Sequence, residues 1–265
     1  MRKYVHNIPC MGYYLKMERH MSELTQYEPN GYNPSTGIYV SREVFTGSWE
    51  NEIADLEFTP RTKLITEDAG IAKFDEEKGI QANYLYNTFK SANGQSNFHD
   101  QMKDFWVEEL PEDYSYTDSY MKSPKLAAII DWFQVEKSRC RIFQQQPGVE
   151  MPVHTDFDNK KGMKAGETVR IFVQLNDMPG GAWFRCKTAD SDISVNLQKG
   201  QFLVFHPDAT GHGTCNITEV PRNTFMLVVK RNKFIDNLGN DLSAQMKFID
   251  IDAMVAEKTR ELVTA

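Results

Sequence analysis

Short runs of alternating apolar and polar residues fill the second half of the chain. From residue 139 onward, turn-forming pairs separate these runs, among them Pro147-Gly148, Lys199-Gly200 and Thr210-Gly211. Alternation with a period of two is typical of a strand that has one face in a core. The pattern predicts eight short strands, at 139–146, 149–156, 168–176, 182–187, 192–197, 201–206, 212–217 and 222–230. Eight such strands favour a mainly β fold, a double-sheet jelly roll also described as a double-stranded β-helix.

The first half of the chain has weaker periodicity and mixed elements. Residues 37–40 predict a short strand, and 82–110 predict a pair of helices around the turn at Asn93-Gly94. Ser123-Pro124 has the form of a helix start, and an amphipathic run follows it. The end of the chain, 242–262, also has a helical pattern. We therefore expect α-helices on the flanks of the jelly roll.

Length and composition agree with one enzyme-sized domain that carries extensions. The chain has 265 residues, of which 40% are hydrophobic and 12% aromatic, which suits a substantial core and not a disordered chain. We expect three parts. Residues 1–138 form a mixed, partly helical region that packs on the core, 139–231 form the jelly roll, and 232–265 form a C-terminal helical extension.

The net charge and the cysteine spacing indicate which cellular compartment and which binding partners to expect. A net charge of −7 lacks the basic excess expected of a nucleic-acid-binding protein, although a local basic patch stays open. No apolar run approaches the roughly 20 residues that a membrane-spanning helix needs. The cysteines, at Cys10, Cys140, Cys186 and Cys215, are widely spaced and form no Cys-x-x-Cys pair. This spacing argues against a disulfide framework or a zinc knuckle, so we expect a reducing, cytoplasmic location.

The tripeptide His154-Thr155-Asp156 is the first candidate for chemistry. Residues at i and i+2 of a strand point to the same face, so His154 and Asp156 should lie side by side. His212 follows 56 positions after the aspartate (212 − 156 = 56), on a separate strand. Two histidines and one carboxylate form the facial triad that leaves open positions on a non-haem Fe(II) ion. Taken alone, a His-x-Asp tripeptide is more often a surface or hydrogen-bonding pair, and His206 competes with His212 as the distal histidine.

Arg222 and Thr224 are the second candidate. They share one face of the last predicted strand, beside the apolar run Phe225-Met226-Leu227-Val228-Val229. A guanidinium that points into a core needs an anionic partner, and its planar fork suits a carboxylate. Two partners remain open at this point: an acidic side chain of the chain itself, or the carboxylate of a bound small molecule.

In these motifs the chain resembles the Fe(II)/2-oxoglutarate-dependent oxygenases. The resemblance rests on His-Thr-Asp at 154–156, Gly-His-Gly-Thr-Cys at 211–215 and Arg-Asn-Thr at 222–224. It implies a cupin-like core, Fe(II) held by His154, Asp156 and His212, and 2-oxoglutarate and O2 as cosubstrates. It favours His212 over His206, because Arg222 then falls at the family's usual offset and because Pro207 ends the strand after His206. It assigns the distal carboxylate of 2-oxoglutarate to Arg222, with Thr224 in place of the serine that many members have.

Further residues are weaker candidates for contact with a substrate. Arg170 shares a strand face with Phe172 and Gln174, and it lies either in the cavity or in solvent. An arginine at the start of this strand and a later Pro-Gly-Gly turn also occur in the aspartyl- and prolyl-hydroxylase-like oxygenases that the chain resembles. The remaining candidates are Gln144, Gln146, Trp183 and Arg185. A shift of one residue in register would reverse this set and leave one inward glutamine between two outward ones.

Three functional readings follow from the sequence. The first is a hydroxylase of a C–H bond in a small molecule or in an amino-acid or peptidyl side chain, with release of succinate and CO2. The second is an oxygenase that modifies a nucleic-acid base, for which Lys160-Lys161 and Lys164 offer a basic loop. The third is a cupin-fold binding protein without catalysis, although the complete motif set argues against it. The sequence does not fix the prime substrate or the oligomeric state.

Overall fold

The computed structural model describes most of the second half of the chain and parts of the first. The described residues are 38–68, 71–87, 115–116, 118–134, 138–154, 168–180, 182–189, 192–207, 210–238 and 245–264. Within these ranges, no helix is long and apolar enough to cross a membrane.

The eight strands predicted from 139 onward are all present. They are β5 Ser138–Gln145, β6 Glu150–His154, β7 Thr168–Gln174, β8 Ala182–Lys187, β9 Asp192–Leu197, β10 Gln201–Phe205, β11 Gly211–Cys215 and β12 Arg222–Lys230. Residues 155 and 156, which we placed in the second strand, lie outside the described residues.

These strands form two sheets that face one another. In the large sheet the order is β10-β7-β12-β5, and in the small sheet it is β6-β11-β8-β9. Every pair within them is antiparallel, and all but one of the connections from β5 to β12 cross from one sheet to the other. This order is that of a double-sheet jelly roll, so the predicted mainly β fold is confirmed.

Strands from both ends of the chain extend the large sheet. β1 Ile38–Thr46 pairs with β10, and β13 Lys247–Asp250 pairs in parallel with β1. On the opposite edge, β3 Ile71–Asn87 pairs with β5, β2 Thr59–Asp68 pairs with β3, and β4 Ser115–Tyr116 joins β3. The strand predicted at 37–40 is confirmed and is longer than expected. The proposed division of the chain at 138 and 231 stays a prediction.

Two segments that were expected to be helical are partly β-strands in the structure. Residues 82–87 belong to β3, so the helix pair expected over 82–110 is wrong there, and 88–110 lie outside the described residues. The edge of β5 supplies backbone partners to this segment, and such pairing overrides weak local preference. Near the C-terminus, 247–250 form β13 on the edge of β1, and the helix expected over 242–262 begins only at Ile251.

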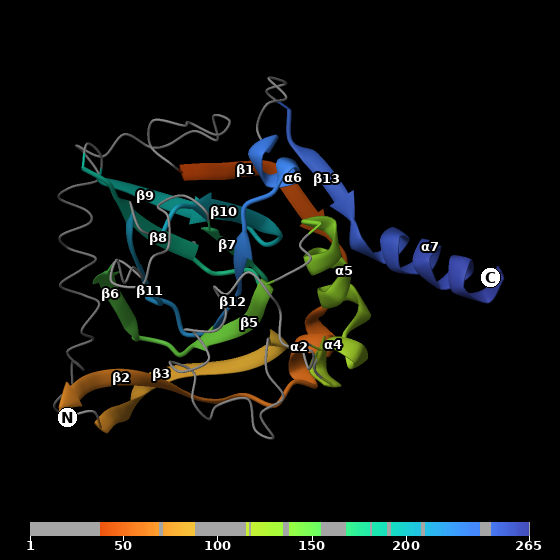
Figure 1. Cartoon of the computed structure of the whole chain (residues 1–265). Coiled ribbons are helices and arrows are strands. Elements are labelled where there is room, and N and C mark those ends of the chain that lie inside the picture. The colour runs from red at the N-terminus through yellow and green to blue at the C-terminus, as the bar shows by residue number, and fades with distance from the viewer. Residues whose placement is uncertain are drawn as a thin grey trace, which may run out of the picture.

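The helices cover the face of the large sheet that points away from the small sheet (Figure 1). They are α2 Glu50–Ala54, α4 Asp118–Lys122, α5 Pro124–Trp132, α6 Lys233–Asp236 and α7 Ile251–Thr264. The helix predicted after Ser123 is α5, and its Leu126 and Ile129 are fully buried. They pack in an outer cluster with sheet residues such as Ile171 and Phe225. Beyond Ile251, α7 extends away from the body of the molecule (Figure 1).

A second apolar cluster fills the space between the two sheets. This inner cluster includes Phe172, Leu203, Phe205 and Met226 from the large sheet and Phe184 from the small sheet. Alternate residues of the large sheet's strands therefore enter the outer and the inner cluster, and both faces of the sheet are buried. A polar side chain on the inner face lies in a low-dielectric region and needs a specific partner.

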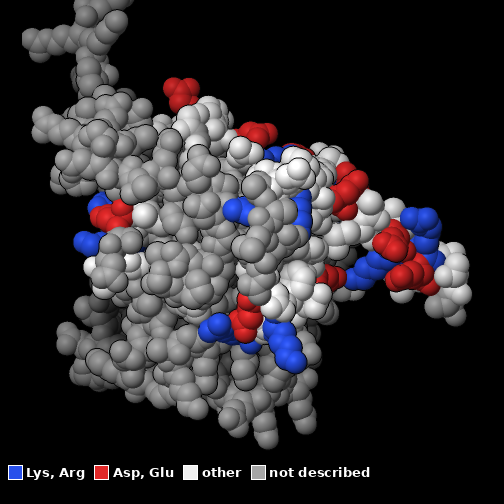
Figure 2. Space-filling model, turned by 90° about the horizontal axis from the view of Figure 1, so that it is seen from above, with Lys and Arg blue, Asp and Glu red and all other residues white. Residues whose placement is uncertain are grey.

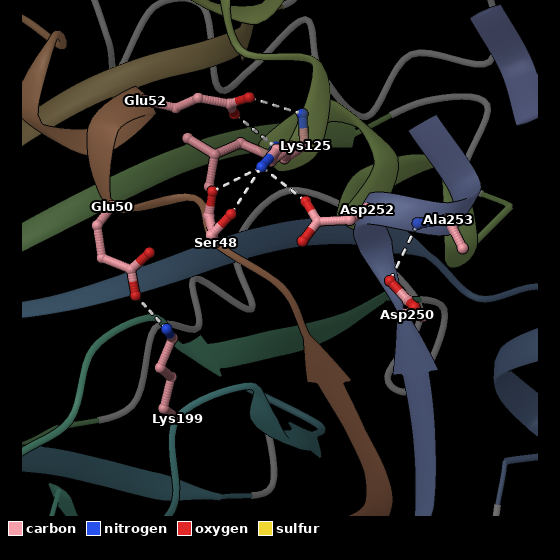
Figure 3. A network of polar contacts seen from close by, with 9 residues as sticks. Ser48, Glu50, Glu52, Lys125, Lys199, Asp250, Asp252 and Ala253 are labelled. Carbon is pink, nitrogen blue, oxygen red and sulfur yellow. Dashed lines mark hydrogen bonds and ion pairs between the residues drawn. The ribbon is translucent and has the colours of Figure 1, made fainter. Parts of the chain in front are cut away.

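A polar network joins the segment after β1 to α5 and α7 (Figure 3). Lys125 Nζ donates to the Ser48 carbonyl oxygen at 2.8 Å and lies 2.6 Å from Asp252 Oδ1. The hydrogen bond from Lys125 lowers the pKa of the Asp252 carboxyl. At the start of α7, the Ala253 N–H donates to Asp250 Oδ1 at 3.0 Å. These contacts attach the first turn of α7 to the body of the protein.

Glu52 caps α5 from a different element. Its two carboxylate oxygens accept the backbone N–H groups of Lys125 and Leu126, each at 3.0 Å. Ser123, at the N-cap position, makes no side-chain capping bond, so the Glu52 carboxylate satisfies donors that a local cap would otherwise bind. A negative charge is also favourable at the positive end of a helix.

We predict that Glu52→Ala lowers the free energy of unfolding by about 1 kcal/mol, the usual effect of losing a helix cap. The midpoint of urea denaturation measures this change. Glu261→Ala, which removes an exposed glutamate of α7, serves as the control and should leave the midpoint almost unchanged. Equal midpoints for the two variants would mean that the Glu52 bonds do not contribute to stability.

Candidate metal and anion site

His154 and His212 lie side by side on neighbouring strands of the small sheet. His154 ends β6, His212 is the second residue of β11, and the two are paired directly in the ladder. Their ring centroids are 4.6 Å apart. Gly213 follows in a stretch where the register shifts, and a Cβ atom there would lie 2.7 Å from the Met151 carbonyl oxygen. The glycine therefore allows β6 and β11 to approach closely where the two histidines meet.

Backbone carbonyls orient both imidazole rings. His154 Nδ1 lies 2.8 Å from the Pro152 carbonyl oxygen, and His212 Nδ1 lies 3.3 Å from that of Thr210. A carbonyl oxygen only accepts hydrogen bonds, so each Nδ1 donates, and the tautomer that this contact favours has its lone pair on Nε2. Metal-binding histidines commonly have this arrangement, in which a backbone acceptor fixes the tautomer and aims Nε2 at the ion. Nothing in the sequence pattern identified these two carbonyl partners.

The two histidines that competed for the distal position lie in different places. His212 is 2% exposed, and its ring centroid is 4.7 Å from that of Phe205 in the inner cluster. His206 lines a small cavity of about 10 Å³ with Tyr39, Val204 and others, residues that belong to the outer cluster or lie beside it. Of the two, the fold brings His212 next to His154.

The carboxylate of the predicted triad cannot be placed. Asp156 and Thr155 lie outside the described residues. Among the residues that are described, no group of three His, Cys, Asp or Glu side chains could hold a metal ion. The metal set of His154, Asp156 and His212 stays a prediction, with the position of its two histidines described.

Arg222 is almost completely buried, at 1% exposure, and its contacts are with neutral groups. Nε donates to Gln174 Oε1 at 3.2 Å, and Nη1 donates to the Trp183 carbonyl oxygen at 2.9 Å. The central carbon of the guanidinium lies 4.1 Å from the centroid of the Phe184 ring. Burial lowers the pKa of this group to about 9, so it remains a cation at neutral pH. Among the described residues, no acidic side chain pairs with Arg222.

One nitrogen of Arg222 has no partner among the described residues. Nη2 is buried and makes no hydrogen bond, although a buried donor of a charged group is costly to leave unsatisfied. Thr224 lies two residues along the same face and is also buried. Arg222 and Thr224 therefore present a guanidinium nitrogen and a hydroxyl group on the inner face of the large sheet.

The arginine lies about one layer of side chains from the histidine pair. In β11, Thr214 pairs with Phe184, whose ring lies against Arg222. His212 is two residues before Thr214, and two residues of a strand span about 7 Å. A five-carbon dicarboxylate has a comparable length. The strand geometry therefore separates the level of His212 from that of Phe184 and Arg222 by about two strand residues.

A set of amides holds Gln174 in position beside Arg222. Gln174 Nε2 donates to the Asn176 carbonyl oxygen at 2.9 Å and to Asn176 Oδ1 at 3.1 Å. Asn176 is held in turn, because its Nδ2 donates to the Pro221 carbonyl oxygen and its Oδ1 accepts from the Asn223 N–H, each at 2.9 Å. With its nitrogen committed in this way, Gln174 directs Oε1 toward Arg222. The sequence placed Gln174 on the same face as Arg170 and Phe172 but did not indicate this role.

The glutamines at 144–146 point to the opposite sides of the sheet from those that we favoured. Gln145 is buried, accepts from the Thr214 hydroxyl at 3.1 Å and shares its face with Phe143 of the inner cluster. Gln144 lies on the other face, where it contacts Asn223, and Gln146 donates to Gln144. The inward residue is therefore Gln145. Because both faces of this strand are buried, alternation alone could not reveal which glutamine points inward.

The two candidates for substrate contact on β8, Trp183 and Arg185, have side chains that point away from the space between the two sheets. Phe184 and Cys186 belong to the inner cluster, so Trp183 and Arg185 lie on the opposite face of the strand. The Trp183 indole donates to the Gly180 carbonyl oxygen, and Arg185 forms a bidentate pair with Asp192. Trp183 contributes its carbonyl oxygen to the site, through Arg222, and not its side chain. Arg170, in contrast, is 4% exposed and shares its face with Phe172, so it points inward.

The cysteines differ from one another. Cys186 is paired directly with His212 across β8 and β11, and burial raises the pKa of its thiol to about 12. It is therefore a neutral apolar residue beside the histidines. Cys140 is also a buried free thiol, whereas Cys215 is disulfide-bonded. The reducing setting that we expected from the cysteine spacing does not explain this bond, and the cytoplasmic location stays a prediction.

We predict that Gln174→Leu lowers the free energy of unfolding by about 1–3 kcal/mol, because Arg222 Nε loses its buried acceptor. Guanidinium chloride denaturation measures the effect. Gln198→Leu, at an exposed position before β10, is the matched control and should have little effect. Similar losses for the two variants would show that Arg222 does not depend on Gln174.

Comparisons with known proteins give likenesses in structure only. No protein-family model matches the chain, and no curated protein matches it. It resembles a prolyl hydroxylase from Trichoplax adhaerens solved with a hypoxia-inducible factor peptide, with 13% identity, 84% of this chain and 95% of that chain covered, and a TM-score of 0.47. It also resembles a 2OG-Fe(II) oxygenase family oxidoreductase from Burkholderia pseudomallei, with 12% identity, 88% and 94% covered, and a TM-score of 0.39. A Pseudomonas putida prolyl-4-hydroxylase shows 17% identity, 57% and 69% coverage and a TM-score of 0.33. Identities and scores this low support no statement about activity.

Proposed function

We propose that this protein is an Fe(II)- and 2-oxoglutarate-dependent oxygenase that hydroxylates a C–H bond of a small molecule or of an amino-acid or peptidyl side chain. The observation that carries the proposal is the buried Arg222, whose Nη2 makes no hydrogen bond within the described residues. It lies about one side-chain layer from two histidines that are oriented through Nδ1. An anion-binding group and a metal-binding pair at this spacing fit 2-oxoglutarate on a metal ion.

Each residue has a distinct role in this proposal. His154, Asp156 and His212 hold Fe(II), which when bound with 2-oxoglutarate and O2 supplies the oxidation that yields succinate and CO2. Arg222 binds the distal carboxylate through its fork, and the Thr224 hydroxyl contributes a further hydrogen bond. Gln174 fixes the plane of the guanidinium, since it accepts from Nε. The rings of Phe172 and Phe184 exclude water from the space between these groups.

The two other readings have less support. Lys160, Lys161 and Lys164, the basic loop of the base-modifying alternative, lie outside the described residues. Figure 2 shows Lys and Arg side chains interspersed with Asp and Glu on the described part of one face, α7 included, and not a uniformly basic surface. A binding protein without catalysis would not need two adjacent histidines, each with a backbone carbonyl beside Nδ1. Nothing in the described residues favours either reading over the hydroxylase.

We predict that anaerobically purified, Fe(II)-loaded protein forms succinate from 2-oxoglutarate when oxygen is admitted, even without a prime substrate. His212→Ala and Asp156→Ala should abolish this succinate, because each removes a proposed ligand. His206→Ala is the matched control, since this histidine lines a cavity beside the outer cluster and not the space between the two sheets, and it should retain the activity. Wild type without succinate and without a charge-transfer band on anaerobic addition of Fe(II) and 2-oxoglutarate would contradict the proposal.

We predict that Arg222→Met raises the 2-oxoglutarate concentration needed for half-maximal succinate formation by about 10- to 100-fold. Hydrogen bonds from a charged donor contribute about 1.5–3 kcal/mol, and the variant loses them while it keeps the bulk of the side chain. The requirement for Fe(II) should change far less. Arg185→Met, which removes an arginine on the outer face, is the control. An unchanged 2-oxoglutarate requirement would make Arg222 a structural residue.

A further inference from the structure

The anion site is connected to a tryptophan on the other face of the large sheet. Trp49 lies at the N-cap position of α2, and its side chain is fully buried in the outer cluster. The indole Nε1–H donates to the Leu175 carbonyl oxygen at 2.8 Å. Leu175 follows the last residue of β7, Gln174, which accepts from Arg222 Nε. The indole therefore holds the backbone next to the residue that orients the guanidinium.

The N–H group explains why a tryptophan suits position 49. Because β7 ends at Gln174, the Leu175 carbonyl lies beyond the regular strand, and a buried carbonyl needs a donor. A phenylalanine would fill much of the same space but would leave this oxygen without the indole hydrogen bond. The Leu175 N–H is held as well, because it donates to the Asn223 carbonyl oxygen at 3.0 Å. Both backbone polar groups of Leu175 are thus fixed.

A second connection reaches the backbone of Gln174 itself. The Gly200 N–H donates to the Gln174 carbonyl oxygen at 2.7 Å, and the Gly200 carbonyl oxygen accepts from the Phe45 N–H in β1 at 2.9 Å. Gly200 has a φ of +80°, and a Cβ atom there would lie 1.9 Å from the Phe45 carbonyl oxygen, so this approach requires glycine. Two consecutive residues, 174 and 175, are therefore held from the end of β1 and the segment that follows it.

Lys199 attaches the turn before β10 to the same tryptophan. Its Nζ lies 4.9 Å from the centroid of the Trp49 ring and pairs with Glu50, the next residue (Figure 3). A partly exposed ion pair contributes little by itself, but a cation over an indole face also restrains the ring. Trp49 is therefore fixed by burial in the outer cluster, by the Leu175 carbonyl and by the Lys199 ammonium.

We propose that Trp49, on the outer face of the large sheet, is a positioning residue for Arg222 on the inner face and acts through Gln174. This proposal rests on the proposed function, in which Arg222 binds the distal carboxylate of 2-oxoglutarate. A shift of the backbone at 174–175 moves Gln174 Oε1, and the Arg222 Nε–H follows its acceptor. Loss of the indole N–H therefore weakens dicarboxylate binding in a protein that is still folded.

The first experiment measures binding without turnover. Isothermal titration calorimetry of the full-length, Fe(II)-loaded protein without oxygen gives the dissociation constant of 2-oxoglutarate, at a temperature well below every variant's unfolding midpoint. Trp49→Phe should raise this constant by about threefold or more, within the range of indirect couplings between residues. Trp132→Phe removes an indole that packs against the same outer cluster, so it is the matched control and should leave the constant unchanged. Equal constants for wild type and Trp49→Phe would overturn the proposal.

A double-mutant cycle tests the route through Gln174. In the Gln174→Leu background, Trp49→Phe should add little to the dissociation constant, because the acceptor that Trp49 positions is already absent. Fully additive effects would overturn this route. Benzothienylalanine at position 49 has sulfur in place of the indole N–H and fills the same volume. It tests the hydrogen bond if the phenylalanine variant does not fold, and a wild-type constant in that protein would overturn the proposal.

A second readout needs no ligand and separates this proposal from the proposed function. The Arg222 Nε–H gives a nuclear magnetic resonance signal in the metal-free protein, which its loss in Arg222→Met assigns. Trp49→Phe should shift this signal and quicken its exchange with solvent, and an unchanged signal would overturn the proposal. If wild type binds no 2-oxoglutarate, the oxygenase assignment fails and the signal alone decides the role of Trp49. If wild type binds it and Trp49→Phe changes neither readout, the oxygenase assignment stands and Trp49 is a packing residue.

Discussion

The burial of the Arg222 guanidinium is the constraint around which this interior is arranged. A charge inside a jelly roll loses its hydration, and the surrounding protein must replace it. Here the replacements are an amide oxygen from Gln174, a backbone oxygen from Trp183 and the face of the Phe184 ring. These groups are dipoles and not charges. They orient the guanidinium without cancelling its charge, so its attraction for an incoming anion is retained. A glutamate at position 174 would satisfy the same nitrogen and neutralise the site.

Orientation by neutral groups recurs at the histidines. Each Nδ1 lies beside a backbone carbonyl oxygen two residues earlier in the chain. Backbone partners are positioned by the strand itself, so the tautomer follows once β6 and β11 are paired. The close approach of these strands depends on Gly213, where a side chain would collide with the Met151 carbonyl. The sheet that forms the fold thus also sets the chemistry of the two rings.

The sequence was sufficient where one physical rule dominated. The eight strands of the jelly roll were predicted because turn pairs separate them. The proximity of His154 and His212 was expected from their residue types and spacing, and their role as metal ligands stays a prediction. The sequence was insufficient where one residue pattern is compatible with several structural environments. Gln144 and Gln145 exchanged roles because both faces of β5 are buried, which removes the contrast that fixes register. Residues 82–87 and 247–250 joined sheet edges, since pairing partners far away in the sequence outweighed local preference. The partners of the histidine Nδ1 atoms are backbone atoms, which a residue pattern does not reveal.

The two halves of the candidate site lie on opposite sheets, so its geometry depends on how the sheets are held apart. Arg222, Thr224 and Arg170 belong to the large sheet, and the two histidines belong to the small one. Between them, the rings of Phe172 and Phe184 are stacked with centroids 5.3 Å apart. Phe184 also lies against Arg222, and the ring centroid of Phe172 is 6.0 Å from that of His212. One aromatic pair therefore contacts both Arg222 and His212. Because packed rings resist compression and separation alike, this pair sets the distance between the arginine on one sheet and the histidines on the other.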